Sequence, residues 1–127
     1  AELWVKPGGA ASVGYHLRHI AGALDRLLTY AHGALLNDAQ RVALAAEKQE
    51  DPDCSVTTLV EGVQVAIERT LGTLRSTPRD QLFGPRGVGK AQLPSNVIGL
   101  LYHVAEHTVR HTGQVIVTAR VVRSSGS

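Results

Sequence analysis

Apolar residues recur every three or four positions along three long stretches of this 127-residue chain. That spacing brings apolar side chains to one side of an α-helix, and it predicts helices at about 12–31, 55–75 and 96–122. Ser12 and Ser55 begin two of these stretches and suit the N-cap position, where a side-chain oxygen accepts from a free backbone N–H. Only 4% of the residues are aromatic, so the core must consist mainly of Ala, Leu, Val and Ile. Such a core favours closely packed helices over a β-sandwich rich in aromatic residues.

A fourth, shorter helix is expected at about 38–49. Asn37 and Gln40 have the spacing of a capping box, in which the two side chains bond to each other's backbone N–H groups. The sequence Glu50-Asp51-Pro52-Asp53 ends this helix, because proline cannot continue it. The fold predicted from these patterns is all-α: a helical bundle with three main helices and one short helix.

The remaining segments have the composition of turns and chain ends. Residues 76–94 contain three prolines and three glycines, which predicts a loop with a short hairpin. Residues 1–10 form a lead-in with a proline-glycine turn, and residues 124–127 are expected to be a disordered tail. Residues 1–127 then make a single domain, which agrees with the usual size of one.

The loop also contains a pattern that resembles a phosphate-binding motif. Residues 84–90, GPRGVGK, have the glycine and lysine spacing of a P-loop. The next residue is Ala91, where magnesium coordination needs Ser or Thr, and Pro94 lies where the first helical turn should hold the phosphate. No buried strand precedes the pattern. A solvated basic turn is therefore the better interpretation.

Charge is unevenly distributed along the chain, whose formal net charge is +2. Residues 1–68 contain five Lys/Arg and nine Asp/Glu, whereas residues 69–127 contain eight and two. The basic half suits a small anionic substrate better than nucleic acid, because basic residues neither form a run nor alternate with aromatic ones. No apolar stretch is long enough to cross a membrane, and the single cysteine, Cys54, excludes an intramolecular disulfide. We expect a cytoplasmic protein without nucleic-acid or membrane partners.

Five of the six histidines fall in two clusters. His103, His107 and His111 repeat every four residues, so a helix places all three on one side, where neighbouring imidazoles can share an ion. His16 and His19 lie on the first predicted helix and can supply a further ligand. Imidazole is a common ligand of divalent transition metals. The clusters therefore predict a metal site, with zinc or nickel as the ion.

Position relative to the apolar face separates these candidates. His107 and His111 lie close to the apolar face of the last helix and are predicted to point inward. His103 lies farther round and is predicted to be a neighbour of the site or an alternate ligand. On the first helix His16 is nearer to the apolar centre than His19, so periodicity favours His16 there.

Two residues that follow His111 also need a reason for their presence. Gln114 lies within reach of the site and could hydrogen-bond a ligand or a bound water. Gly113 costs about 1 kcal/mol relative to alanine inside a helix. We expect it to permit close approach of a neighbouring helix beside the site.

The segments around these histidines resemble the DinB-like family, which is named for damage-inducible proteins. The resemblance rests on residues 19–26, HIAGALDR, and on residues 103–114, HVAEHTVRHTGQ, and it extends from about residue 3 to residue 120. It implies a bundle of the four-helix type with a three-histidine site for a divalent metal ion. The ligands that it implies are His19, His107 and His111.

The chain differs from the family at its beginning. Members usually have a long helix before the segment that matches Glu2-Leu3-Trp4, and that helix is missing from this sequence. Its loss would leave apolar surface uncovered, and large exposed apolar patches are typical of protein–protein contacts. We therefore expect a homodimer that completes the bundle.

Two main classes of function remain open at this point, and DNA association, suggested by the family's name and the basic half of the chain, is a weaker third. A divalent ion with an open coordination position lowers the pKa of a bound water or thiol, and the resemblance implies a hydrolase or a thiol-dependent transferase with a small-molecule thiol or anionic substrate. The alternative is a non-catalytic oligomeric interaction or structural module, in which the histidines are hydrogen-bonded or hold a structural metal. No second catalytic base is evident, so no catalytic residue is assigned.

Overall fold

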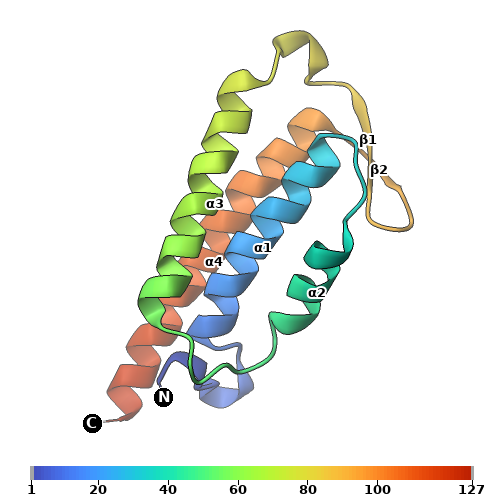
Figure 1. Cartoon of the computed structure of the whole chain (residues 1–127). Helices are drawn as coiled ribbons and strands as arrows, with labels where there is room; N and C mark the ends of the chain where they lie inside the picture. The colour runs from blue at the N-terminus through green and yellow to red at the C-terminus, as the bar shows by residue number, and fades with distance from the viewer. Residues whose placement is uncertain (1, 127) are drawn as a thin grey trace.

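The computed structural model describes residues 2–126 and consists mainly of helices (Figure 1). The helices are α1 (Val13–Ala31), α2 (Asp38–Ala46), α3 (Val56–Ser76) and α4 (Val97–Ser125), with short 3₁₀ helices at Glu2–Trp4, Pro7–Gly9 and Arg79–Gln81. An antiparallel hairpin of β1 (Pro85–Val88) and β2 (Leu93–Asn96) connects α3 to α4, and its register pairs Pro85 with Asn96 and Val88 with Leu93. The predicted all-α bundle, with three long helices and one short helix, is confirmed.

Helix α1 lies at the centre of the arrangement, in contact with α2, α3 and α4. Figure 1 shows α1 and α3 running in the same direction and α4 running in the opposite one. Ile20 and Leu24 of α1 pack on Val104 of α4, and aliphatic side chains of α3 cover this cluster. Burying each such side chain contributes about 1.5–3 kcal/mol. The core is therefore aliphatic, as the shortage of aromatic residues requires.

The predicted helix starts are present at the predicted caps. The hydroxyls of Ser12 and Ser55 each accept a hydrogen bond from the backbone N–H three residues later. Asn37 and Gln40 form both bonds of the capping box. These side chains satisfy N–H groups that the first helical turn leaves without partners, which explains why α1, α2 and α3 begin where they do.

Helix α2 ends at Ala46, about three residues before the predicted end. Arg18 of α1 donates to the carbonyl oxygens of Ala46 at 3.2 Å and Gln49 at 2.8 Å, and its guanidinium pairs with Asp51 at 2.9 Å. These bonds satisfy carbonyl groups at the end of α2. They also tie the end of α2 to α1.

The glycine-rich segment 84–90 forms β1 and the turn that follows it. Because α4 begins only at Val97, no helix N-terminus follows Lys90, and the segment lacks the geometry of a phosphate-binding loop. The Nε of Arg86 donates to the carbonyl oxygen of Ala31 at 2.7 Å. The hairpin therefore rests on the end of α1.

Helix α4 extends past its predicted end at residue 122. Ser124 and Ser125, which were expected in a disordered tail, belong to the helix, and both hydroxyls donate to the carbonyl oxygen of Val121. Their polar side chains are satisfied within the helix, so they do not terminate it. Ser127 lies outside the described residues.

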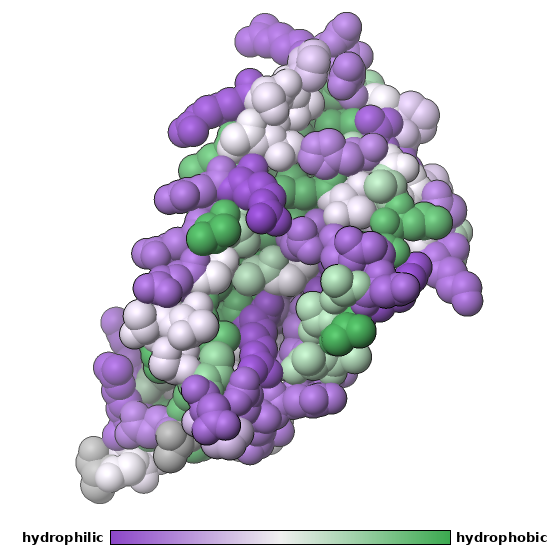
Figure 2. Space-filling view, viewed as in Figure 1, coloured by the Kyte–Doolittle hydropathy of each residue, from purple (hydrophilic) through white to green (hydrophobic). Residues whose placement is uncertain are grey.

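Hydrophobic groups are interspersed among hydrophilic ones on the surface, for example over α2 (Figure 2). Several large aliphatic side chains of α3 and α4 are also exposed. Among residues 2–126, none of the helices is both long enough and apolar enough to span a bilayer.

Candidate metal centre

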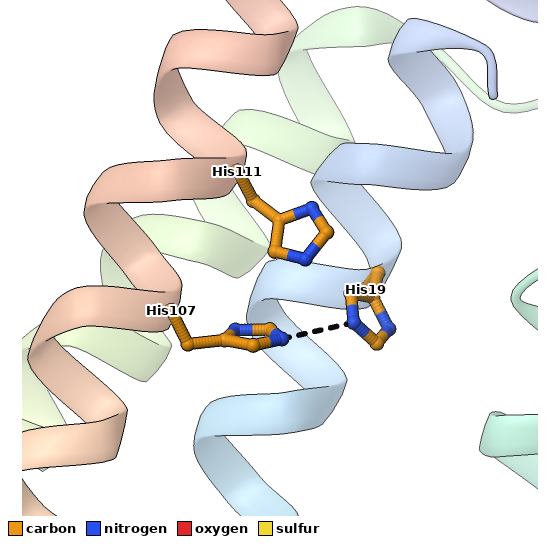
Figure 3. Close-up of side chains that lie close together, drawn as sticks. All are labelled: His19, His107 and His111. Carbon is orange, nitrogen blue, oxygen red and sulfur yellow. Dashed lines mark hydrogen bonds between the residues drawn. The ribbon is translucent and has the colours of Figure 1, made fainter. Parts of the chain in front are cut away.

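Three histidine side chains converge between α1 and α4 (Figure 3). His19 comes from α1, whereas His107 and His111 come from adjacent turns of α4. One ring nitrogen of each residue lies within 4.8 Å of the corresponding nitrogens of the other two. Three of the sequence-predicted site residues are thus brought together by the fold. We call them the histidine triad.

Hydrogen bonds define which nitrogen of His19 faces the triad. Its Nδ1–H donates to the Oε2 atom of Glu47 at 2.8 Å, so Nε2 is the nitrogen that faces the triad. This Nε2 lies 3.1 Å from Nε2 of His107. Nδ1 of His107 is buried and has no hydrogen-bond partner among residues 2–126.

His111 is in contact with the other histidine of α1. Its Nδ1 lies 3.0 Å from Nδ1 of His16, so Nε2 is the nitrogen available to the triad. His16 is only 6% exposed, which agrees with its predicted position near the apolar centre. Periodicity nevertheless favoured the wrong residue for the triad, because α1 contacts α2 as well as α4 and therefore also covers the side that carries His19.

Glu47 is a buried carboxylate directly behind His19. It follows the last residue of α2, is 4% exposed, and its Oε1 accepts from Nη1 of Arg26 at 2.5 Å. Burial raises the pKa of Glu47, but the hydrogen bonds from His19 and Arg26 outweigh burial, so the net pKa lies below its ordinary value. Gly22 leaves room for the pair, since a Cβ there would meet both Glu47 and Arg26. An ionised carboxylate on the far nitrogen of a histidine fixes the ring and increases its basicity as a ligand.

The ring of Tyr15 stacks on His19, with centroids 5.3 Å apart and an interplanar angle of 9°. Burial, followed by the charge of Glu47, raises the pKa of the phenol. Tyr15 therefore stays protonated at neutral pH and encloses one side of the triad.

Sequence reasoning missed Glu47, Arg26 and Tyr15. Tyr15 and Arg26 could have been found from their spacing. With His19 and Gly22 they follow one another at intervals of four, three and four residues, which places all of them on one side of α1. Nothing distinguishes Glu47 from the other acidic residues of the 47–53 segment.

The two remaining candidates lie beside the triad. His103 is half exposed, its Nδ1–H donates to Glu106 at 2.8 Å, and its ring lies edge-on to His107 at 5.6 Å. Gln114 is exposed and lines an open depression of 500 Å³ together with His16 and Arg110. Both residues occupy the edge of the site.

The expectation for Gly113 is wrong. A Cβ at this position would meet no atom within 4 Å among the described residues, so no neighbouring helix approaches it. Gly113 follows His111 by two residues, about 200° round the helix, and therefore faces away from the site.

The electrostatics of the site keep the rings of His107 and His111 neutral. Burial, followed by the charges of neighbouring residues that include histidines, lowers the pKa of His107 and of His111 to about 4. Burial and then His19 lower the pKa of His16. Neutral imidazole is the form that binds a metal ion, and it is present at neutral pH.

The triad fits a divalent ion. Two nitrogens bound to zinc at 2.0–2.1 Å in a tetrahedral site lie about 3.3 Å apart, close to the 3.1 Å between His19 and His107. An ion held here would be bound by Nε2 of His107, whose Nδ1 has no hydrogen-bond partner among residues 2–126. Three histidines at these positions could hold a metal ion, and imidazole donors suit zinc and nickel.

Comparison with known families agrees with this geometry. A family model described as the DinB superfamily matches residues 2–115, a range that contains both histidine-bearing segments. A comparison with curated proteins finds none that is similar to this chain. Because the family match covers most of the sequence and includes the complete triad, the chain belongs to the DinB superfamily.

Proposed function

We propose that this protein binds a divalent ion, zinc or nickel, through the histidine triad and acts on a small anionic substrate as a hydrolase or a thiol-dependent transferase. The observation that carries the proposal is the convergence of three imidazoles, one of which is held by the buried carboxylate of Glu47. An ion bound there would supply a Lewis acid that lowers the pKa of a coordinated water or thiol.

The surroundings of the triad support an anionic substrate. Arg110 is half exposed and lines the 500 Å³ depression beside His16, where its guanidinium can meet a carboxylate or phosphate. A second depression of 340 Å³, on the Tyr15 side, is lined by Lys48 and by Lys6, which pairs with the carboxylate of Glu50 in the same lining. Cationic side chains therefore lie on both sides of the triad.

Metal analysis of protein purified without an immobilised-metal column tests the binding site. We expect about one equivalent of zinc or nickel in the wild type and its loss in His107→Ala and His111→Ala, since two imidazoles cannot replace three. His103→Ala is the matched control, because it removes a histidine from the same helix but outside the triad. Undiminished metal in both triad variants would refute the assignment.

The catalytic part of the proposal requires an exchangeable coordination position. X-ray absorption of the zinc-loaded protein should show three imidazole nitrogens and a lighter fourth ligand that thiols displace. A closed set of four protein ligands would contradict catalysis and support a structural metal instead.

A further inference from the structure

A cavity of 510 Å³ lies away from the histidine triad, between α2 and the turn of the hairpin. Its volume is within the range of pockets that take small organic ligands, about 300–1,000 Å³. The end of α1, the link from α1 to α2, the second turn of α2 and the hairpin turn form its walls (Figure 1). It shares no lining residue with either depression beside the triad. We call this cavity the hairpin pocket.

One wall of the hairpin pocket is apolar. Leu35 and Leu36 of the link and Tyr30 in the last turn of α1 line it. Leu35 is 61% exposed, so most of this leucine is in contact with water. An apolar body placed against these three side chains would remove that surface from water, which is favourable.

Two cationic side chains line the same cavity from the other elements, Arg41 from α2 and Lys90 from the hairpin turn, and no carboxylate lines it. Lys90 has no ion-pair partner among residues 2–126. Arg41 pairs with Asp38 at 2.8 Å, but the carboxylate is 97% exposed, and ion pairs of that kind contribute little. A ligand carboxylate can therefore replace Asp38 at the guanidinium and also meet the ammonium group of Lys90.

Hydrogen bonds fix the walls of the hairpin pocket relative to one another. The Nε of Arg86 joins the hairpin to α1 through the carbonyl oxygen of Ala31. The side-chain amide of Gln40 joins the start of α2 to α1, since it donates to Asp25 at 2.9 Å and to Thr29 at 2.8 Å. A pocket whose walls are already fixed loses less conformational freedom when a ligand binds.

The hairpin turn holds Lys90 through a strained residue. Gln92 has a φ of 51° and is the one residue other than glycine with a positive φ among residues 2–126. Its side-chain amide donates to the carbonyl oxygen of Gly89 at 2.9 Å, which closes the turn around Lys90. Strained backbone of this kind is concentrated at ligand-binding and active sites. Gln92 and Gly89 both line the hairpin pocket.

We propose that the hairpin pocket binds a small aromatic carboxylate, with its ring against Leu35, Leu36 and Tyr30 and its carboxylate between Arg41 and Lys90. A guanidinium donates two parallel hydrogen bonds to a carboxylate, and the lysine adds a second positive charge. An inorganic anion would leave the apolar wall in water, and an uncharged aromatic molecule would leave both cations without a partner. The site is separate from the triad and does not depend on a bound metal ion.

Titration of the metal-free wild type with 4-(trifluoromethyl)benzoate, followed by ¹⁹F NMR, tests this site. We expect saturable binding of one molecule per chain, with the same affinity after zinc is added. The neutral amide 4-(trifluoromethyl)benzamide has the same shape without the charge and should bind about 10-fold more weakly or less. Benzoate binding that requires zinc would place the anion at the triad and overturn the proposal.

Three variants locate the bound molecule. Arg41→Gln and Lys90→Gln should each weaken benzoate binding about 10-fold and leave benzamide binding unchanged, since each removes one charge from the pocket. Lys48→Gln is the matched control, because it removes a lysine that lies just beyond α2 and lines a depression beside the triad instead. All three residues are exposed, so helix content should equal that of the wild type. Absence of saturable binding, equal affinity for the two probes, or equal loss in Lys48→Gln would refute the site.

Discussion

Glu47 is the side chain that most affects how His19 can bind an ion. Its carboxylate holds Nδ1–H of His19 and directs Nε2 toward the triad. In Glu47→Gln the charge is lost and Arg26 loses its ionic partner. We expect metal affinity to fall about 10- to 100-fold, the usual effect of removing such a partner, as measured by competition with a chromophoric chelator.

The matched control for this substitution is Glu50→Gln. Glu50 follows Glu47 by three residues and pairs with Lys6 at the surface, where ion pairs contribute little. This variant should bind metal as the wild type does. Equal affinity in Glu47→Gln and the wild type would mean that Glu47 has no part in orienting His19.

The sequence predicts the triad only in part, for a geometric reason. His107 and His111 follow from spacing alone, because a helix fixes the relation between residues four apart. His19 depends on the family resemblance, since its position is determined by which helices surround α1. Glu47 could not be predicted, because its contact with His19 bridges 28 residues and depends on where α2 packs.

At the scale of elements, α2 serves to place Glu47. The capping box of Asn37 and Gln40 starts this nine-residue helix, which is in contact with α1. In Asn37→Ala the loss of the cap should cost about 1 kcal/mol and loosen α2, so metal affinity should fall with stability. Thermal unfolding and metal titration of the same variant measure both.

Ser55→Ala provides the comparison for the α2 variant. It removes the equivalent cap from α3, which carries no residue of the metal centre. Its stability should fall by a similar amount while its metal affinity stays unchanged. A parallel loss of affinity in both cap variants would show that α2 has no special role.

The helices and their starts were predictable, whereas the ends of α2 and α4 were not. Apolar periodicity and caps are local properties, so each helix appears where its sequence predicts. The end of α2 depends instead on Arg18, a residue of another helix. The prediction of a neighbouring helix beside Gly113 was wrong, since no described residue lies within 4 Å of a Cβ there. What surrounds this residue depends on the packing of the whole bundle.

At the scale of the whole molecule, the triad makes the stability of the metal-free protein depend on pH. His107 and His111 have pKa values of about 4 in the folded chain, compared with about 6.5 in an unfolded one. Between these values the unfolded state binds more protons, so the folded state loses stability as pH falls from 6.5 to 4. Above pH 6.5 this contribution is complete.

Urea unfolding of the metal-free protein between pH 7.5 and 4 measures this dependence. The midpoint should decrease through that window, and the decrease should be smaller in a His107→Ala/His111→Ala variant, which lacks the two groups. A midpoint that is constant with pH in the wild type would contradict the lowered pKa values.

The triad joins helices that lie far apart along the chain. His19 and His107 are separated by 88 positions, so an ion held by both would close a ring that contains α2, α3 and the hairpin. By the relation for cross-links, closing a ring of that length raises the free energy of the unfolded chain by about 4.6 kcal/mol. Global unfolding would then require release of the ion, and the lifetime of the protein against proteolysis would follow the metal supply of its surroundings.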